Sequence, residues 1–163
     1  MKYIFFSLFL SLFVLSAFAQ RTLPSVEIQD LDGRTVNIQD YATEGKLTVL
    51  SFWATWCTPC KRELNNIADL YPEWQEKYNV QLVAVSIDNA RSFPQVRPYV
   101  TAQDWEYIVL SDINQNLQRA LGFQTVPQTF LLDKNGHIVY DHNGYVDGDE
   151  YVLEEKIMEE ASK

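Results

Sequence analysis

The sequence predicts an α/β fold: a central mixed β-sheet flanked by helices, with an N-terminal β-hairpin extension. The main observation is a pair of dense β-branched and aromatic runs at 47–53 and 80–87, which are typical of buried central strands. Helical periodicity follows the first run. Strands that alternate with helices pair in parallel through right-handed crossovers, so the centre of the sheet is expected to be parallel.

Two hairpins are predicted, one at each end of the sheet. Residues 26–29 and 35–38 alternate apolar and polar positions around a turn that contains Asp-Gly. Residues 129–132 and 137–140 flank a turn that contains Asn-Gly, which is the strongest short signal for a hairpin. The two hairpins add antiparallel strands to the parallel centre.

A long helix is expected to follow the cysteines at the end of the first buried strand. Leu64, Ile67, Ala68 and Tyr71 repeat at helical spacing and define one apolar face. Pro72 is expected to kink or end this helix, because proline removes a backbone hydrogen bond. The remaining elements are expected to be helices at 92–103, 114–121 and 149–161 and a short strand at 107–110.

Length and charge restrict the classes of protein that the chain can represent. The 163 residues are enough for one domain with a substantial core. The formal net charge is −9, and Lys and Arg are scattered singly apart from Lys61-Arg62. A basic face is therefore absent from the sequence pattern, which argues against nucleic acid as a partner.

The N-terminal residues have the pattern of a secretory signal peptide at 1–19. A positive start, an apolar run over 3–18 and a small-x-small ending favour cleavage after Ala19. Cleavage would leave residues 20–163 as one exported domain, periplasmic or otherwise extracytoplasmic. The alternative is an uncleaved membrane anchor, although the run is shorter than the roughly 20 residues of a spanning helix. Export would place the cysteines where disulfides persist.

Cys57 and Cys60 are the only cysteines, and they stand between a predicted strand and a predicted helix. A bridge between them would close a very small loop and stabilise the fold little. Cys57 is expected at the helix N-terminus, where free N–H groups and the helix dipole favour the reactive thiolate. Cys60, one turn later, would be more buried and placed to resolve a mixed disulfide. Thr58 and Pro59 would shape the turn, since proline suits a first helical turn.

Zinc binding is an alternative use of the cysteines. The Cys-x-x-Cys pair and the pair His137 and His142 have spacings found among zinc ligands. The two histidines are an odd number of residues apart, so on one strand they would face opposite sides. We therefore interpret them as ordinary strand or turn residues and expect no metal.

Residues 52–61, Phe-Trp-Ala-Thr-Trp-Cys-Thr-Pro-Cys-Lys, closely resemble the active site of thioredoxin-fold proteins. Residues 125–130, Thr-Val-Pro-Gln-Thr-Phe, support the resemblance independently. In that family the proline that matches Pro127 is cis and lies beside the cysteines, and the residue that matches Val126 offers its backbone to an extended substrate. The resemblance implies a thioredoxin-like fold for the whole domain. The substrate-binding residues that it implies, with Trp56 as an apolar docking rim, are Trp56, Thr58, Pro59, Val126 and Pro127.

The early hairpin, the export signal and the continuation Lys-Arg-Glu after Cys60 resemble the exported TlpA/ResA-type thioredoxins. In that branch an acidic residue three places after the second cysteine lies near the active site, and Glu63 matches it. Ser51 departs from thioredoxins proper, which carry a buried acid there, and Asn65 replaces a common helix-kinking proline. Glu63 is therefore the candidate proton acceptor for Cys60, a role that requires partial burial and a raised pKa.

The predicted function is an exported thiol–disulfide oxidoreductase. Cys57 would attack a substrate disulfide, and Cys60 would resolve the mixed disulfide. The resemblance favours reduction of protein disulfides, with the haem-site thiols of apocytochrome c as one substrate class. No cofactor is expected. Electrons would come from an upstream thiol donor, for which a membrane-embedded protein is one option, and the enzyme is expected to be a monomer.

Three alternatives share the fold. A disulfide-forming oxidase would use the same cysteines in the opposite direction. A peroxiredoxin-like peroxide reductase would need Thr or Ser three places before the reactive cysteine and Pro seven places before it, and Ala54 and Leu50 occupy those positions. A binding module would use the groove at Pro127 without redox chemistry, which would leave the placement of Cys57 unexplained.

Overall fold

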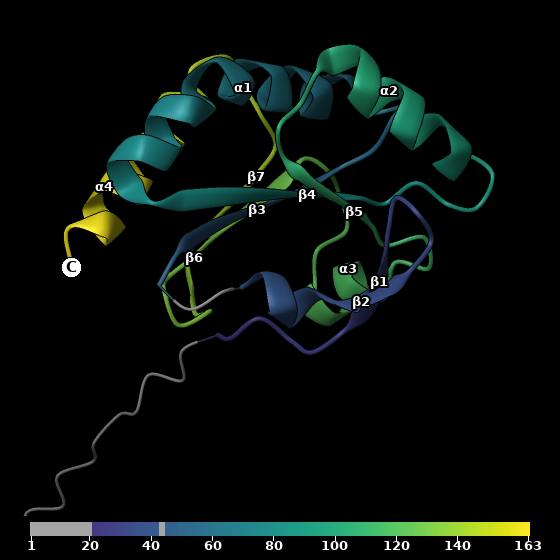
Figure 1. The fold of residues 1–163 in the computed structure, drawn as a ribbon, viewed down its shortest axis with the longest axis horizontal. Coiled ribbons are helices and arrows are strands. Elements are labelled where there is room, and N and C mark those ends of the chain that lie inside the picture. Colours follow the sequence, from purple (N-terminus) through teal and green to yellow (C-terminus); the bar gives the residue numbers. More distant parts are fainter. Residues whose placement is uncertain (1–20, 43–44) are drawn as a thin grey trace, which may run out of the picture.

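The computed structural model describes residues 21–42 and 45–163; the predicted signal peptide at 1–19 and its cleavage after Ala19 lie outside the described residues. The described strands are β1 (Glu27–Asp30), β2 (Thr35–Asn37), β3 (Leu47–Trp53), β4 (Val80–Ser86), β5 (Ile108–Ser111), β6 (Gln128–Leu132) and β7 (Ile138–Asn143). The described helices are η1 (Ile38–Tyr41), α1 (Thr58–Tyr78), η2 (Phe93–Gln95), α2 (Val96–Gln103), α3 (Asn116–Leu121) and α4 (Asp149–Ala161). Figure 1 shows α1 and α2 along one face of the sheet and α3 on the other side.

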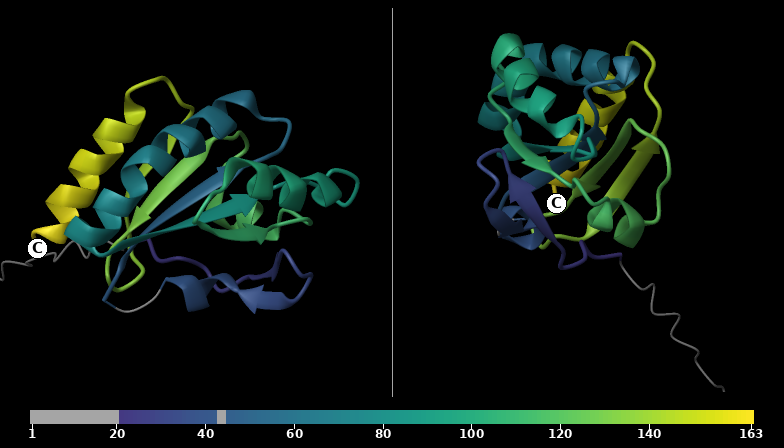
Figure 2. Two further views of the ribbon diagram at one scale, coloured as in Figure 1. Left: turned by 45° about the horizontal axis from the view of Figure 1, so that its top comes forward. Right: turned by 90° about the vertical axis from the view of Figure 1, so that its right-hand side faces the viewer.

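The sheet is mixed, as the sequence predicts, and its order is β2-β1-β5-β4-β3-β6-β7. The central pairs β3–β4 and β4–β5 are parallel, whereas β3–β6 and β6–β7 are antiparallel. The predicted N-terminal hairpin forms between β1 and β2 and joins the sheet through an antiparallel pairing of β1 with β5. The views in Figure 2 show α4 beside α1 on the same face, where both cover the central strands.

Strands β3 and β4 form the centre of the core, because every residue of both strands is buried. Their runs of Val, Leu and aromatic residues suit strands that are covered on both faces. The parallel register pairs Trp53 with Ser86, so both strands end at the same edge of the sheet. Residues 54–57 leave β3 at this edge and lead into α1, which places the two cysteines there.

The sequence predicts that the helix kinks or ends at Pro72; Pro72 lies inside α1, so the helix does not end there. The helix continues to Tyr78 and ends with Asn79 in the left-handed conformation. Proline removes one hydrogen bond from a helix, but burial of Tyr71 and Trp74 on either side packs both halves of α1 against the sheet. Tertiary packing here outweighs the local preference of proline.

The other differences between prediction and structure concern the starts and ends of elements. The segment predicted as a helix at 92–103 is divided into η2, which contains Pro94, and α2, which begins at Val96. Proline fixes its backbone angle and lacks an N–H, so Pro94 favours a short first turn over a full α-helical start. Nearer the N-terminus, Ile38 begins η1 and is not part of the hairpin strand. Helix α4 covers 149–161, as predicted.

Candidate active site

The two cysteines lie at the junction of β3 and α1 and are joined by a disulfide, with 5.4 Å between their Cα atoms. Cys57 is the N-cap of α1, and its Sγ accepts a hydrogen bond of 3.3 Å from the Cys60 backbone N–H. Cys60 is fully buried, while Cys57 retains 5% exposure. Pro59 occupies the first turn of the helix. The arrangement gives Cys57 both the better access and the electrostatic advantage of the helix N-terminus.

Asp88 fixes the loop that precedes Cys57. This carboxylate is fully buried just beyond β4 and accepts hydrogen bonds from the Thr55 N–H (2.9 Å) and the Thr55 hydroxyl (2.7 Å). The Ser86 hydroxyl donates a third bond of 2.8 Å. A buried carboxylate needs such donors, because its charge is costly to remove from water. Thr55 is therefore held at two atoms, two residues before the reactive cysteine.

Lys61 fixes the same loop from the helix. Its Nζ donates a hydrogen bond of 3.0 Å to the Thr55 carbonyl and lies 5.4 Å from the centroid of the Tyr99 ring. The ammonium group thus contacts both a carbonyl oxygen and an aromatic face, and both of these favour a cation. Loop, α1 and α2 are joined at this one side chain.

The two tryptophans before Cys57 have opposite environments. Trp53 is fully buried and packs against Tyr99 and Trp105, with ring centroids 5.6 and 5.1 Å away. Trp56 is 62% exposed next to Cys57. This separation matches the sequence interpretation of Trp53 as core and of Trp56 as a surface rim beside the cysteines.

The segment around Pro127 approaches the cysteines from the neighbouring strand. The Val126–Pro127 peptide bond is cis, which is the isomer that the resemblance implies. Strand β6 begins immediately afterwards and pairs Gln128 with Phe52 near the end of β3. Pro127 is buried and Val126 half-buried. No hydrogen bond among residues 21–42 and 45–163 engages the Val126 N–H or C=O, so both remain available to a partner.

Glu63 is buried one turn after Cys60, with only 4% exposure. Its Oε1 accepts a hydrogen bond of 2.7 Å from the Thr129 hydroxyl, and its Oε2 has no hydrogen-bond partner within the described part of the chain. Burial raises the pKa of Glu63 to about 7, an effect that the Thr129 hydrogen bond opposes. The two conditions that the sequence set for a proton acceptor, burial and a raised pKa, are both met.

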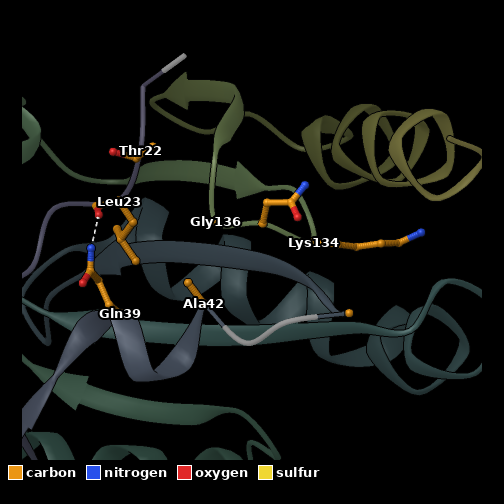
Figure 3. A pocket seen from close by; sticks show the side chains of 8 residues that line it. Thr22, Leu23, Gln39, Ala42, Lys134 and Gly136 are labelled. Atoms are coloured by element: carbon orange, nitrogen blue, oxygen red, sulfur yellow. Dashed lines mark hydrogen bonds between the residues drawn. The ribbon is translucent and has the colours of Figure 1, made fainter. Parts of the chain in front are cut away.

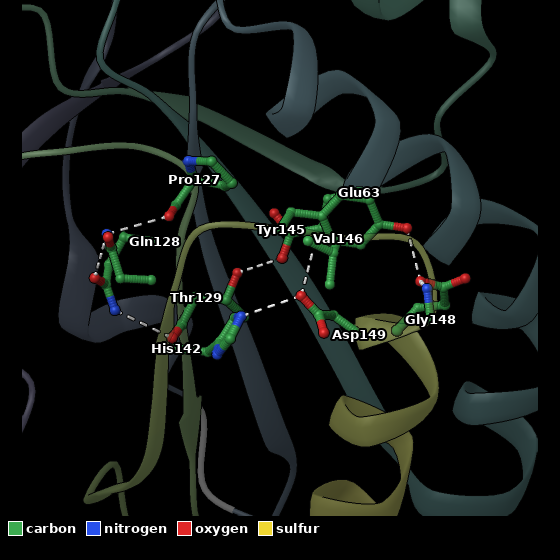
Figure 4. Close-up of polar contacts among 11 residues, drawn as sticks. Glu63, Pro127, Gln128, Thr129, His142, Tyr145, Val146, Gly148 and Asp149 are labelled. Carbon is green, nitrogen blue, oxygen red and sulfur yellow. Dashed lines mark hydrogen bonds and ion pairs between the residues drawn. The ribbon is translucent and has the colours of Figure 1, made fainter.

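Two further acids at the start of α4 face this site. The charges of Asp149 and Glu150 also raise the pKa of Glu63. Asp149 contacts His142 Nε2 at 3.2 Å and accepts a hydrogen bond from the Val146 N–H, as Figure 4 shows. Glu150 is itself buried and accepts hydrogen bonds from Tyr145 and the Gly148 N–H. The start of α4 is thus tied by hydrogen bonds to β7 and to the loop that joins these two elements.

The two departures from thioredoxins proper have simple consequences. Ser51 is fully buried, and its Oγ has no hydrogen-bond partner among the described residues, so it leaves the position beneath the cysteines uncharged. Asn65 accepts a hydrogen bond of 2.9 Å from Trp105 Nε1 and therefore ties α1 to the segment after α2. Glu63, one turn after Cys60, remains the candidate acid for the cysteine pair.

The histidines of the zinc alternative have carboxylate neighbours of their own. His137 Nδ1 lies 3.0 Å from Asp133 within the β6–β7 turn. His142, on β7, contacts Asp149 at the start of α4. In the described ranges, no group of three or more His, Cys, Asp and Glu side chains is arranged to hold a metal ion. Nor does any helix in those ranges combine the length and apolarity that a membrane crossing needs.

A pocket of about 960 Å³ lies elsewhere, beside the start of β3. Figure 3 shows it between Gln39, Ala42 and the β6–β7 turn at Lys134 and Gly136. Strand β3 runs for seven residues from this end to the cysteines, which separates the two regions by about 20 Å. The lining residues that the structure describes include no cysteine, histidine or carboxylate and carry none of the chemistry discussed above.

The roles of two residues in the site could not be predicted from the sequence. Asp88 and Thr129 lie far from the cysteines along the chain and reach the site only through strand pairing. The signal that could have indicated Asp88 is a lone carboxylate directly after a buried strand, because charges at such positions are rarely left unpaired. Thr129 lies within the segment 125–130 that carries the resemblance, but nothing in that segment indicates its hydrogen bond to Glu63.

Comparison with known proteins agrees with this geometry. The sequence profile of the AhpC/TSA family matches residues 19–141. The chain is 31% identical over 121 residues to the thiol-disulfide oxidoreductase ResA of Bacillus thuringiensis subsp. konkukian, covering 74% of this chain and 67% of that protein. It is 34% identical over 117 residues to ResA of Geobacillus thermodenitrificans, covering 72% and 64%. The chain thus spans about two thirds of the length of these relatives.

A solved structure gives the same result for the fold. An uncharacterized thioredoxin-like protein from Porphyromonas gingivalis superposes with a TM-score of 0.77 and 40% sequence identity, over 86% of this chain and 92% of that one. The fold and the cysteine pair define a thioredoxin-like thiol–disulfide oxidoreductase. The chain belongs to the AhpC/TSA family, and its curated relatives above carry the name ResA.

Proposed function

We propose that this protein is an exported, monomeric reductant of protein disulfides. The observation that supports it best is the placement of three parts around the end of β3: the Cys57–Cys60 pair at the start of α1, the cis-proline segment that leads into β6, and the buried Glu63, which is hydrogen-bonded to Thr129 of β6. The first part carries the electrons, the second offers backbone groups to a substrate, and the third can accept a proton.

The reaction begins with the dithiol form. The Cys57 thiolate attacks one sulfur of the substrate disulfide, forms a mixed disulfide and releases the other substrate sulfur as a thiolate. Cys60 loses its proton to Glu63 and attacks the Cys57 sulfur, which releases the second substrate thiol. The enzyme then holds the Cys57–Cys60 disulfide that the structure contains. Two electrons have passed from the enzyme to the substrate, and no cofactor takes part.

Substrate binding in this proposal uses main-chain hydrogen bonds and an apolar rim. An extended substrate segment pairs with the free N–H and C=O of Val126, in the manner of an added strand. Trp56, Thr58 and Pro59 are exposed around Cys57 and form the surrounding contact surface. Pro127, buried beneath Val126, holds the segment at the cysteines.

The direction of electron flow and the partners are part of the proposal. The names of the curated relatives support thiol–disulfide exchange, and the sequence resemblance favours reduction, including reduction of haem-site cysteines in apocytochrome c. Export, predicted from residues 1–19, would make the enzyme depend on an upstream thiol donor, such as a membrane-embedded protein that carries electrons across the bilayer. Size-exclusion chromatography with light scattering tests whether the protein is a monomer in solution.

The first experiment is to equilibrate the cysteine pair with glutathione and follow Trp fluorescence. A reduction potential near or below about −250 mV places the protein with reductants such as thioredoxin and supports the proposal. A potential near −120 mV, that of strong oxidants, would overturn it in favour of disulfide formation. Peroxide consumption no faster than that of a simple dithiol would separately exclude the peroxide reductase.

A further inference from the structure

The side chain of Asn143 occupies an unusual position beside the cis-proline segment. Asn143 is the last residue of β7 and stands opposite Gln128 in the antiparallel register. Its Nδ2 donates to the carbonyls of Thr125 (3.0 Å) and Pro127 (3.3 Å) and to Gln128 Oε1 (3.0 Å). These two carbonyls belong to the residues on either side of Val126.

The amide group is itself held in orientation. The Thr125 hydroxyl donates a hydrogen bond of 3.0 Å to Asn143 Oδ1, which leaves Nδ2 facing the carbonyls. The two carbonyls can only accept, so they require the N–H donors of the amide on their side and exclude the flipped arrangement, whereas the Thr125 hydroxyl could donate or accept. The next residue, Gly144, adds a backbone hydrogen bond of 2.8 Å to the Pro127 carbonyl. Figure 4 shows the polar contacts that meet at Pro127 and Gln128.

The contacts of the neighbouring residues leave Val126 with free backbone groups. Pro127 has no N–H, its carbonyl and that of Thr125 are occupied by Asn143, and Gln128 pairs within the sheet. Within the described part of the chain, Val126 is therefore the one residue of this segment whose N–H and C=O are both free. A partner strand that approaches the cysteines finds a single residue with which to exchange a pair of hydrogen bonds.

We propose that Asn143 is a positioning residue for substrate: its amide engages the carbonyls that flank Val126 and so orients the free Val126 pair toward an extended peptide. The inference rests on the proposed function, because it assumes that Val126 receives the substrate backbone. It goes further by assigning the alignment of that backbone to a side chain on β7, outside the cysteine and proline segments. Peptide disulfides should depend on Asn143, and disulfides without a peptide backbone should not.

The test uses a Cys60→Ser background, in which the mixed disulfide with Cys57 accumulates whichever direction the enzyme works in. The measured quantity is the rate constant for its formation with two probes. One probe is the symmetrical disulfide of an acetylated and amidated Ala-Ala-Cys-Ala-Ala peptide, and the other is hydroxyethyl disulfide. Asn143→Asp keeps the shape but replaces the two N–H donors by an acceptor. The matched control is Asn135→Asp, the same change in an exposed turn.

We expect Asn143→Asp to lower the peptide-to-hydroxyethyl rate ratio about three- to tenfold, as the loss of one or two hydrogen bonds predicts, and Asn135→Asp to leave it unchanged. An unchanged ratio in a folded Asn143→Asp protein overturns the inference. Should that variant fail to fold, Thr125→Val, which removes only the bond that orients the amide, must lower the ratio by a smaller factor. No mixed disulfide with either probe in the parent would overturn the proposed function itself.

Discussion

Glu63 on α1 and Thr129 on β6 share a buried hydrogen bond of 2.7 Å, although 66 positions separate them in the chain. The contact joins the helix that carries the cysteines to the strand that begins after the cis-proline. It also engages one carboxylate oxygen of Glu63 and leaves the other without a hydrogen-bond partner in the described structure. A buried acid with one free oxygen, one helical turn after Cys60, is suited to exchange a proton.

The first prediction concerns the resolving step. Glu63→Gln should slow release of the mixed disulfide about a hundredfold, a typical contribution of a general base, and leave its formation by Cys57 largely intact. In the parent the release rate should rise with pH up to about 7, the pKa of Glu63, and then level off. Stopped-flow measurement of both steps checks this. Equal slowing of both steps, or none, would contradict the role of Glu63 as proton acceptor.

A second variant serves as the control for this pH profile. The charge of Asp149 raises the pKa of Glu63. Asp149→Asn should therefore move the midpoint of the release profile to lower pH while keeping the maximal rate. A midpoint that stays in place would mean that Glu63 is not the group that titrates.

The raised pKa of Glu63 also predicts how the stability of the fold depends on pH. Burial raises the pKa of Glu63 from 4.5 to about 7 in the folded state, so its folded form resists ionisation. The associated stability is fully present below pH 4.5 and is lost as pH rises toward 7, because only the unfolded chain ionises in that interval. The loss is roughly 3 kcal/mol. Urea unfolding of the oxidised protein at several pH values should show this decline in the parent and a flatter curve in Glu63→Gln. Parallel curves would contradict it.

The outcome for Asp88 illustrates what a sequence can and cannot predict. The strands around it were predictable, since runs of β-branched residues identify buried strands wherever they occur. Cys57, Cys60 and Pro127 were also predictable, because the residues that carry the resemblance are contiguous in the chain. Asp88 was not, because its function depends on β3 and β4 ending at the same edge of the sheet.

Pro72 and Glu150 show the same limit in two further ways. A local rule predicts that the helix kinks or ends at Pro72, yet packing of the residues around it lets α1 continue to Tyr78. Residues 147–160 are rich in Asp and Glu, a composition typical of an exposed helix face, yet Glu150 is buried and accepts a hydrogen bond from Tyr145. Long-range partners decide both outcomes, and hydrophobic periodicity carries no information about them.

The third prediction tests the contact between Asp88 and Thr55. Asp88→Asn offers one acceptor oxygen to three donors, so at least one buried donor loses its partner. We expect a loss of about 2 kcal/mol in the free energy of unfolding and faster hydrogen exchange at the Thr55 N–H. Chemical denaturation and exchange measurements check both effects. Asp40→Asn, the same change at an exposed position, is the control, and an equal loss in both variants would refute the special role of Asp88.

The last prediction compares the two tryptophans before Cys57. Trp53 is fully buried and Trp56 is 62% exposed, so the same change to alanine should have opposite consequences. Trp53→Ala should cost about 3–5 kcal/mol of folding free energy, as large-to-small changes of buried aromatic residues do. Trp56→Ala should alter stability by less than about 0.5 kcal/mol.

Trp56→Ala should instead weaken substrate docking. We expect it to slow mixed-disulfide formation with a peptide disulfide about tenfold, because exposed aromatic residues supply much of the energy of such contacts. The rate with hydroxyethyl disulfide, which is too small to cover the rim, should stay within about twofold of the parent. Equal slowing with both probes would mean that Trp56 acts on the reactivity of Cys57. In that case the apolar rim must be sought elsewhere, and Val146, an exposed apolar residue between β7 and α4, is the next residue to test.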